Sequence, residues 1–341
     1  MIDMLWSLTP LLILLLAAVD ECESAPHKNS PPRIPVVYFY TGHVPVHQWY
    51  TACVGLAHGN PVVVICDRSH PTCAKPDYLS GVQLAYIEDN IHPRYTHFKQ
   101  VFKTFGGTGI VDLQRIFTLA QWMQSHKIET AFYGDSDAAV LTHVGMHRRR
   151  HCDAQLHLSL IDNNEMKMFW VAWIGSSIIT LPFLQEFLEW AIALYADPKY
   201  HHLMLKKQAE APNMCDMSVW YLFVCANAAA NRYTAEATSN WNCPAELPRV
   251  NTSWLICDAQ DDGFDSGRGM KKAHIDFLRQ GTNNETGTPI MYAYHRSSIV
   301  KHRAIFRLSS LHTHAKDEIR NLFPFCSEAE QRKLMQTSRG V

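Results

Sequence analysis

The first part of the chain alternates short, continuously apolar runs with segments of helical periodicity. Residues 34–40, 61–65 and 82–87 are apolar and β-branched runs of the kind found in buried strands. Residues 47–58, between the first two runs, are compatible with a helix. A strand, a helix and a second strand in this order predict a parallel pair joined by a crossover. The pattern therefore favours an α/β sheet.

The pattern weakens along the chain. Further helices are predicted at residues 95–104, 111–123, 181–195 and 217–224, and further strands at 130–133, 156–161, 168–174 and 289–294. Residues 244–280 have little periodicity and many turn residues, which predicts a long loop region. We expect one mixed, mainly parallel sheet flanked by helices in a single domain.

An acidic motif, Asp135-Ser136-Asp137, directly follows the strand predicted at residues 130–133 and Gly134. At extended spacing, residues two apart point the same way, so Asp135 and Asp137 can face one cation. Two anions this close at a buried strand end are unfavourable unless a positive charge neutralises them. A divalent metal is the simplest solution, although the motif also occurs in turns and helix caps.

Three polar residues follow predicted strands, namely Thr41, Asp67 and Asp135. The carboxyl ends of parallel strands meet at one edge of a sheet, where ligands bind, so we expect one shared crevice. No glycine-rich phosphate loop follows the first strand. This excludes nucleotide binding in the Rossmann or Walker manner.

Composition is that of a globular protein with a core: 341 residues, 47% hydrophobic and 18% charged. A formal net charge of −1 argues against nucleic acid as a sequence-independent partner. The basic run at residues 148–150 fits a solvated loop or a contact to a phosphate or an acidic glycan.

The N-terminus resembles a secretory leader. Residues 5–19 form an apolar run of 15 residues, which is short for a membrane span of about 20 residues and favours a cleaved signal peptide. No Lys or Arg precedes the run, so an uncleaved signal-anchor stays open. We expect a signal peptide or signal-anchor at 1–25, a short stem at 26–33, the folded domain at 34–325 and a tail at 326–341.

We accordingly expect the folded domain in the lumen of the ER or Golgi, or secreted if the leader is cleaved, with membrane contact only through an uncleaved N-terminal segment. Sequons at Asn251 and Asn284 agree with this location. Nine cysteines follow Cys22 without C-x-x-C spacing, which excludes a zinc framework. Cys66 with Cys73, and Cys243 with Cys257, are local candidates for disulfides in an oxidising compartment, but the sequence does not fix the connectivity.

Three features together resemble a GT-A-fold, DxD-containing nucleotide-sugar glycosyltransferase: the acidic motif, a helix headed by Asp216, and a last strand that ends at His295 with Lys301 six residues later. The chain is similar over residues 34–305 to the glycogenin-like and lipopolysaccharide galactosyltransferase group. This resemblance implies a GT-A-like sheet. The glycine of that group's late motif is Ser298 in this chain.

The resemblance implies roles for these residues. Asp135, Asp137 and His295 would hold Mn²⁺ or Mg²⁺, with His302 as an alternative to His295, and Lys301 would bind a phosphate oxygen. The donor would also contact Asp135 and the ends of the first two strands, at Tyr40, Thr41, Gly42 and Asp67. Arg115 would reach the donor as well, unless it is a surface charge of its helix.

The implied activity is metal-dependent transfer of a hexose from a nucleotide-diphosphate sugar, expected to be UDP-linked, to a glycan, glycoprotein or lipid acceptor. Asp216 would be the catalytic carboxylate, as a general base in an inverting enzyme or as the stabiliser of an oxocarbenium-like centre in a retaining one. The late motif favours retention. A plain helix N-cap is the other interpretation of Asp216.

Two other functions fit the acidic motif. A haloacid-dehalogenase-like phosphatase also places D-x-D at a strand end, but that family has Thr or Val where this chain has Ala139. A catalytically degenerate carbohydrate-binding protein would retain the fold without metal-dependent donor binding.

Overall fold

The computed structural model describes residues 32–104, 110–145, 156–158, 174–210, 216–228, 243–252, 256–258, 275–282, 289–296, 303–307 and 310–312. Residues from Arg33 onward belong to one compact unit. Within the described ranges, no helix is long and apolar enough to cross a membrane.

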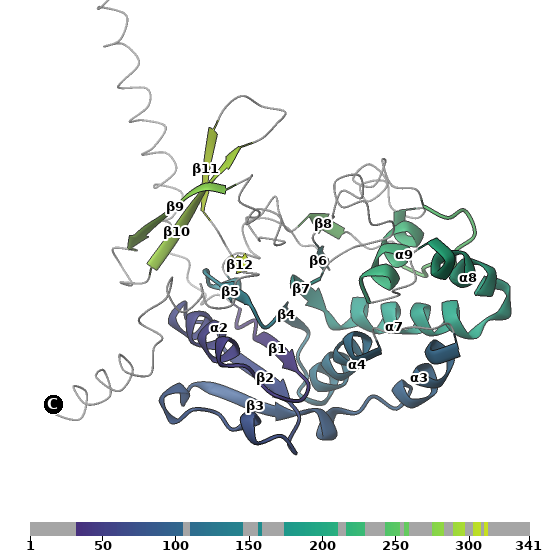
Figure 1. Ribbon diagram of the computed structural model, residues 1–341, viewed down its shortest axis with the longest axis horizontal. Coiled ribbons are helices and arrows are strands. Elements are labelled where there is room, and N and C mark those ends of the chain that lie inside the picture. Colours follow the sequence, from purple (N-terminus) through teal and green to yellow (C-terminus); the bar gives the residue numbers. More distant parts are fainter. Residues whose placement is uncertain are drawn as a thin grey trace, which may run out of the picture. The chain divides into compact units, whose positions relative to one another are not determined.

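A seven-stranded mixed sheet with the order β3-β2-β1-β4-β7-β6-β8 forms the centre of this unit (Figure 1). Four neighbouring strands run parallel, namely β1 (Val36–Tyr40), β2 (Val62–Cys66), β3 (Val82–Tyr86) and β4 (Thr130–Gly134). The antiparallel strand β7 (Ser176–Thr180) pairs with β4, and β6 (Leu156–Leu158) and β8 (Ile256–Asp258) extend the sheet. The predicted mixed, mainly parallel α/β sheet is confirmed.

Helices cover both faces of the sheet. Helix α2 (Val46–Ala57) packs on the face that carries Tyr38 and Val64. The opposite face, with Val37 and Tyr133, packs against α3 (Tyr95–Thr104), α4 (Ile110–Ser125), α7 (Leu181–Ala196) and α9 (Asp216–Ala228). Strands buried on both sides contain few polar residues, which explains why their sequences are continuous apolar runs.

Shorter helices connect these elements: η1 (Pro71–Cys73), η2 (Asp77–Leu79), η3 (Ile87–Asn90), η4 (Pro198–Tyr200) and α8 (His201–Glu210). Strands β2 and β3 follow β1 on one side, and the chain then crosses through α3 and α4 to place β4 on the other side of β1. Strand order therefore reverses between β1 and β4. Such a switch point is where open α/β sheets bind ligands.

Two smaller sheets contain strands from the C-terminal part of the chain. Strands β9 (Ile275–Thr282), β10 (Pro289–Arg296) and β11 (Arg303–Arg307) form an antiparallel sheet. Strand β12 (Ser310–His312) pairs antiparallel with β5 (Ala138–Val140). The expectation of a loop throughout residues 244–280 is wrong, since β8 and part of β9 lie there, and most of the strand expected at 168–174 falls outside the described residues.

Disulfides correct one prediction and confirm another. Cys66 and Cys73 are bonded, as expected. Cys243 is bonded to Cys225 of α9, so the predicted pair with Cys257 is wrong. The physical reason is that Cys257 lies within β8 of the central sheet, whereas folding brings the Cα atoms of Cys225 and Cys243 to 5.4 Å.

Candidate functional site

The acidic motif forms a tight turn at the carboxyl end of β4, next to the switch point. We call Asp135-Ser136-Asp137 the acid turn. Two backbone hydrogen bonds fix its ends: the Asp135 amide donates to the Gly175 carbonyl (2.7 Å) and the Ala138 amide donates to the Asp135 carbonyl (2.9 Å). Gly134 precedes the turn because a Cβ atom there would lie 2.8 Å from the Tyr38 ring. The predicted strand-end position of both carboxylates is confirmed.

Helix α2 also contacts the acid turn. The Thr51 hydroxyl lies 3.0 Å from the Ser136 carbonyl oxygen, and His47 Nε2 lies 3.3 Å from Ser136 Oγ. The buried Tyr38 hydroxyl donates to the Ala138 carbonyl oxygen (3.0 Å), directly after the turn. Burial raises the pKa of Tyr38 far above its usual range, so this hydroxyl stays protonated and able to donate.

Arg115 joins two carboxylates that are distant in the sequence. Its Nη1 atom contacts Asp135 Oδ1 (3.1 Å), and its Nη2 atom contacts Asp216 Oδ2 (2.7 Å). The Arg115 side chain is 19% exposed and that of Asp216 only 3%. The interpretation of Arg115 as a surface charge is therefore wrong. Asp216 is the first residue of α9, as predicted.

The surroundings keep Arg115 charged. Burial alone favours the neutral form, but Tyr133, Asp216 and Asp135 outweigh it and hold the pKa of Arg115 well above its usual value. The guanidinium carbon lies 5.7 Å from the centre of the Tyr133 ring. Within the described part of the chain, the buried Nε atom of Arg115 has no hydrogen-bond partner. Such a donor is costly to leave unsatisfied, so it favours an acceptor from outside these residues.

The backbone at the end of β1 is partly exposed close to the switch point. Tyr40, Thr41 and Gly42 are partly exposed, and Gly42 has a φ of 71°, which glycine adopts readily. A Cβ atom built on Gly42 meets nothing within 4 Å. The main chain at Gly42 therefore borders open space; the donor-binding role of these residues stays a prediction.

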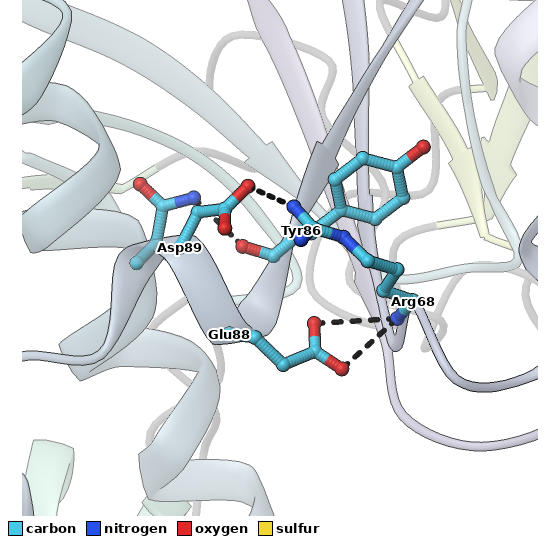
Figure 2. A network of polar contacts seen from close by, with 5 residues as sticks. Arg68, Tyr86, Glu88 and Asp89 are labelled. Carbon is cyan, nitrogen blue, oxygen red and sulfur yellow. Dashed lines mark hydrogen bonds and ion pairs between the residues drawn. The ribbon is translucent and has the colours of Figure 1, made fainter.

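The loop after β2 is fixed by its own polar contacts. Asp67 Oδ1 accepts from the Ser69 amide (3.0 Å) and hydroxyl (2.6 Å), and these hydrogen bonds lower the pKa of Asp67. Figure 2 shows the next residue, Arg68, lying across the Tyr86 ring, with its amide donating to Glu88 and its guanidinium paired with Asp89. Asp67 thus caps a turn at the predicted carboxyl edge.

The predicted late residues are only partly described. His295 lies in β10, where the backbone pairs it with Ala304 of β11 and, across a register shift, with Ile275 of β9. Lys301 and His302 lie outside the described residues.

A different histidine lies opposite the residue that follows the acid turn. In the pairing of β12 with β5, His312 stands directly opposite Ala138, which follows Asp137. Sequence analysis missed this placement because strands of three residues are too short for a periodic signal. The sequence Ser310-Leu311-His312 matches no metal-binding motif.

The donor set at the acid turn suits an oxygen-preferring cation, since it offers two carboxylates from one turn. Arg115 already engages one oxygen of Asp135, so a cation there would share that carboxylate with the guanidinium. Among the residues described, no group of three His, Cys, Asp or Glu side chains is placed to hold a metal ion.

Comparison with solved structures finds remote similarity to glycosyltransferases. PaToxG glycosyltransferase matches with a TM-score of 0.31 at 10% identity, over 62% of this chain and 75% of that one. The apo form of glycosyltransferase GlyE from Streptococcus pneumoniae TIGR4 matches with a TM-score of 0.29 at 13% identity, over 69% of this chain and 57% of that one. No protein-family model and no curated protein sequence matches the chain.

Proposed function

We propose that this protein is a metal-dependent glycosyltransferase that moves a hexose from a nucleotide-diphosphate sugar, with UDP the expected nucleotide, to a glycan, glycoprotein or lipid acceptor. One observation carries the proposal: Arg115 joins Asp135 of the acid turn to Asp216 of α9 at the switch point of the sheet. A single guanidinium therefore bridges a carboxylate of the proposed cation site and a second, separate carboxylate. A glycosyltransferase needs such an arrangement, because its donor and acceptor sites must adjoin.

The acid turn is proposed as the cation site, for Mn²⁺ or Mg²⁺. Because Asp135 also pairs with Arg115, we assign the main carboxylate ligand to Asp137. A cation bound there supplies Lewis-acid stabilisation for the charge that develops on a diphosphate leaving group. Arg115 adds a fixed positive charge beside the same position, and its Nε, which has no hydrogen-bond partner among the described residues, is proposed to donate to a phosphate oxygen.

A nitrogen ligand from the C-terminal region is also part of the proposal. The resemblance points to His295 or His302, whereas strand pairing favours His312 because its backbone lies opposite Ala138. Electron spin-echo spectroscopy of the protein with added Mn²⁺ tests whether a histidine nitrogen coordinates the ion. We expect the nitrogen coupling to disappear in His312→Gln and to persist in His295→Gln and His302→Gln; the reverse pattern returns the assignment to the late motif.

Asp216 is proposed as the carboxylate on the acceptor side of the sugar. Its 2.7 Å contact with Arg115 fixes its orientation relative to the acid turn. A general base in this position gives inversion at the anomeric carbon, and a carboxylate that stabilises an oxocarbenium-like centre gives retention. We favour retention, which NMR of the anomeric proton in the first-formed product tests directly.

The nucleoside is assigned to the open end of β1. Tyr40, Thr41 and Gly42 line the carboxyl edge beside the switch point, and the space above Gly42 lets a ligand approach the backbone. Asp67 is also proposed to contact the nucleoside. It would do so through Oδ2, because Oδ1 already accepts hydrogen bonds from Ser69. Lys301 is proposed to bind a phosphate oxygen, on the resemblance alone.

We place the enzyme in the lumen of the secretory pathway, Golgi or ER. Two disulfides, Cys66–Cys73 and Cys225–Cys243, are typical of an oxidising compartment. Asn251 of the first sequon is exposed, as an acceptor of N-linked glycan must be. The apolar run at residues 5–19 supplies the route of entry.

A thermal-shift screen of nucleoside diphosphates with and without Mn²⁺ tests the proposal. A ligand at 100 times its dissociation constant stabilises the native state by about 2.7 kcal/mol, which such a screen detects. We expect one nucleotide to stabilise the protein only with Mn²⁺, and Asp137→Asn to lose the effect. No shift with any nucleotide would sink the proposal, and stabilisation by fluoroberyllate with Mg²⁺ alone would indicate a phosphatase instead.

A further inference from the structure

Helix α2 contacts the middle residue of the acid turn, Ser136, at its carbonyl oxygen and at its hydroxyl. The Ser136 carbonyl oxygen lies 3.0 Å from the Thr51 hydroxyl, and the Ser136 hydroxyl lies 3.3 Å from His47 Nε2. His47 and Thr51 are four residues apart on the same face of the helix, so they reach the turn together. Both side chains are buried, Thr51 completely.

The Thr51 hydroxyl is itself fixed by a buried neighbour. The Gln48 side-chain amide donates to Thr51 Oγ1 (3.2 Å), and the Gln48 carbonyl oxygen lies 2.8 Å from the same hydroxyl. A hydroxyl carries a single proton, so the Gln48 and Ser136 carbonyl oxygens compete for it. Because the amide of Gln48 already supplies a donor, Thr51 is oriented with its hydrogen toward these two acceptors.

The contacts of Thr51 and His47 with Ser136 can oppose electrostatic repulsion within the acid turn. Asp135 and Asp137 carry like charges one residue apart, and repulsion between them favours conformations that turn the carboxylates away from each other. The backbone hydrogen bonds of Asp135 and Ala138 fix the ends of the turn. The contacts from α2 restrain Ser136, and with it the directions of the side chains on either side.

We propose that Thr51 and His47 are positioning residues that hold the acid turn in its cation-binding conformation before the cation arrives. The inference rests on the proposed function in that a cation is the ligand it serves. A preorganised turn binds more tightly because less conformational freedom is lost on binding. Mutation of a residue that orients a metal ligand without binding the metal itself typically lowers metal affinity 10- to 100-fold.

Two substitutions of Thr51 distinguish the effect of its hydroxyl from the effect of its packing. Thr51→Val keeps the shape of the side chain and removes the hydroxyl, whereas Thr51→Ser keeps the hydroxyl and is the matched control. We expect Mn²⁺ affinity, measured by titration calorimetry without nucleotide, to fall about 10-fold in Thr51→Val and to stay near wild type in Thr51→Ser. Urea unfolding of each variant verifies that the fold is intact.

The same variants are compared by hydrogen exchange without metal. We expect the Ala138 amide, which donates to the Asp135 carbonyl, to exchange faster in Thr51→Val than in Thr51→Ser. If Thr51→Val does not fold, His47→Phe and Ser136→Ala test the second contact, and each is expected to weaken Mn²⁺ binding. Unchanged affinity and exchange in folded Thr51→Val overturn the positioning role.

The two proposals fail in different ways. Wild-type protein that binds no Mn²⁺, either alone or with a nucleoside diphosphate, overturns the metal-dependent glycosyltransferase, and the exchange data then decide whether α2 still orders the turn. Wild-type protein that binds Mn²⁺ as tightly as Thr51→Val keeps the proposed function and rejects the role of Thr51.

Discussion

Arg115 and Asp216 form an ion pair of 2.7 Å although 101 positions separate them in the chain. The same guanidinium contacts Asp135, so three elements, α4, α9 and the end of β4, depend on one side chain for charge balance. Removing one member of a buried ion pair is more damaging than replacing the whole pair, because the other charge is left without compensation.

Loss of Arg115 is therefore expected to destabilise the fold. Arg115→Met keeps much of the side-chain volume and leaves Asp135 and Asp216 without their cation, which costs about 3 kcal/mol. Urea denaturation at pH 7 measures the loss. The double variant Arg115→Met with Asp216→Asn is the control and should recover part of it. A single variant as stable as wild type would contradict the role assigned to Arg115.

Gly134 is expected to tolerate no side chain. Gly134→Ala places a Cβ atom 2.8 Å from the Tyr38 ring, which is fully buried and cannot retreat, so we expect a loss of about 1–3 kcal/mol. Gly81→Ala is the matched control, because its Cβ meets only the tip of Leu56 at 3.3 Å. Equal unfolding midpoints for the two variants would rule out the steric explanation.

Acidification is expected to weaken the protein through His92. Burial, and then the charge of Arg94, lower the pKa of His92 below its ordinary value of 6.5. His92 therefore binds a proton more readily in the unfolded chain than in the folded one. Its contribution to the free energy of unfolding is present above pH 6.5 and is lost as the pH falls toward the folded pKa. Because the ring is half-exposed, the effect stays below about 1 kcal/mol.

His92→Gln isolates this contribution from the other histidines. The difference in unfolding free energy between pH 7.5 and pH 5.5 should be smaller in the variant than in wild type. The Arg94 amide donates to His92 Nδ1 (3.2 Å), which fits a neutral ring with its proton on Nε2. An equal or larger pH response in the variant would show that folding does not lower the pKa of His92.

Asn251 is expected to carry an N-linked glycan when the chain is made in a secretory host. The residue is exposed, and the backbone amides of Asn251 and Thr252 are held by Glu186, which presents the sequon at the surface. Removal of N-glycans by a glycosidase should lower the mass of wild type by more than that of Asn251→Gln. Asn284→Gln serves as the comparison, and identical shifts in wild type and Asn251→Gln would refute occupancy.

The sequence predicted the parts of the fold that long apolar patterns encode. Strands β1, β2 and β4 and helix α7 are nearly continuous in apolar residues because both faces or a broad stripe are buried. Strand β7 was missed because it contains Ser176 and Ser177, two polar residues that are completely buried. Three-residue strands such as β5 and β12 are specified by their partners and not by their own residues.

The site was predictable where a local motif existed. The strand-terminal pair Asp135 and Asp137 and the helix-heading Asp216 follow from spacing and from element boundaries. That Arg115 would pair with both Asp135 and Asp216 has no local signal, since the contact depends on how α4 and α9 pack. The true partner of Cys243 was hidden for the same reason, because Cys225 lies in a buried helix.

The pairing of β5 with β12 also bears on the order of synthesis. Strand β5 obtains its partner from residues roughly 170 positions later in the chain, and a ribosome needs on the order of ten seconds or more to add them. Until then the apolar edge of Ala138, Ala139 and Val140 can pair with strands of other nascent chains. Asp135 and Asp137 lie directly before this edge, and charge beside an apolar strand disfavours such pairing.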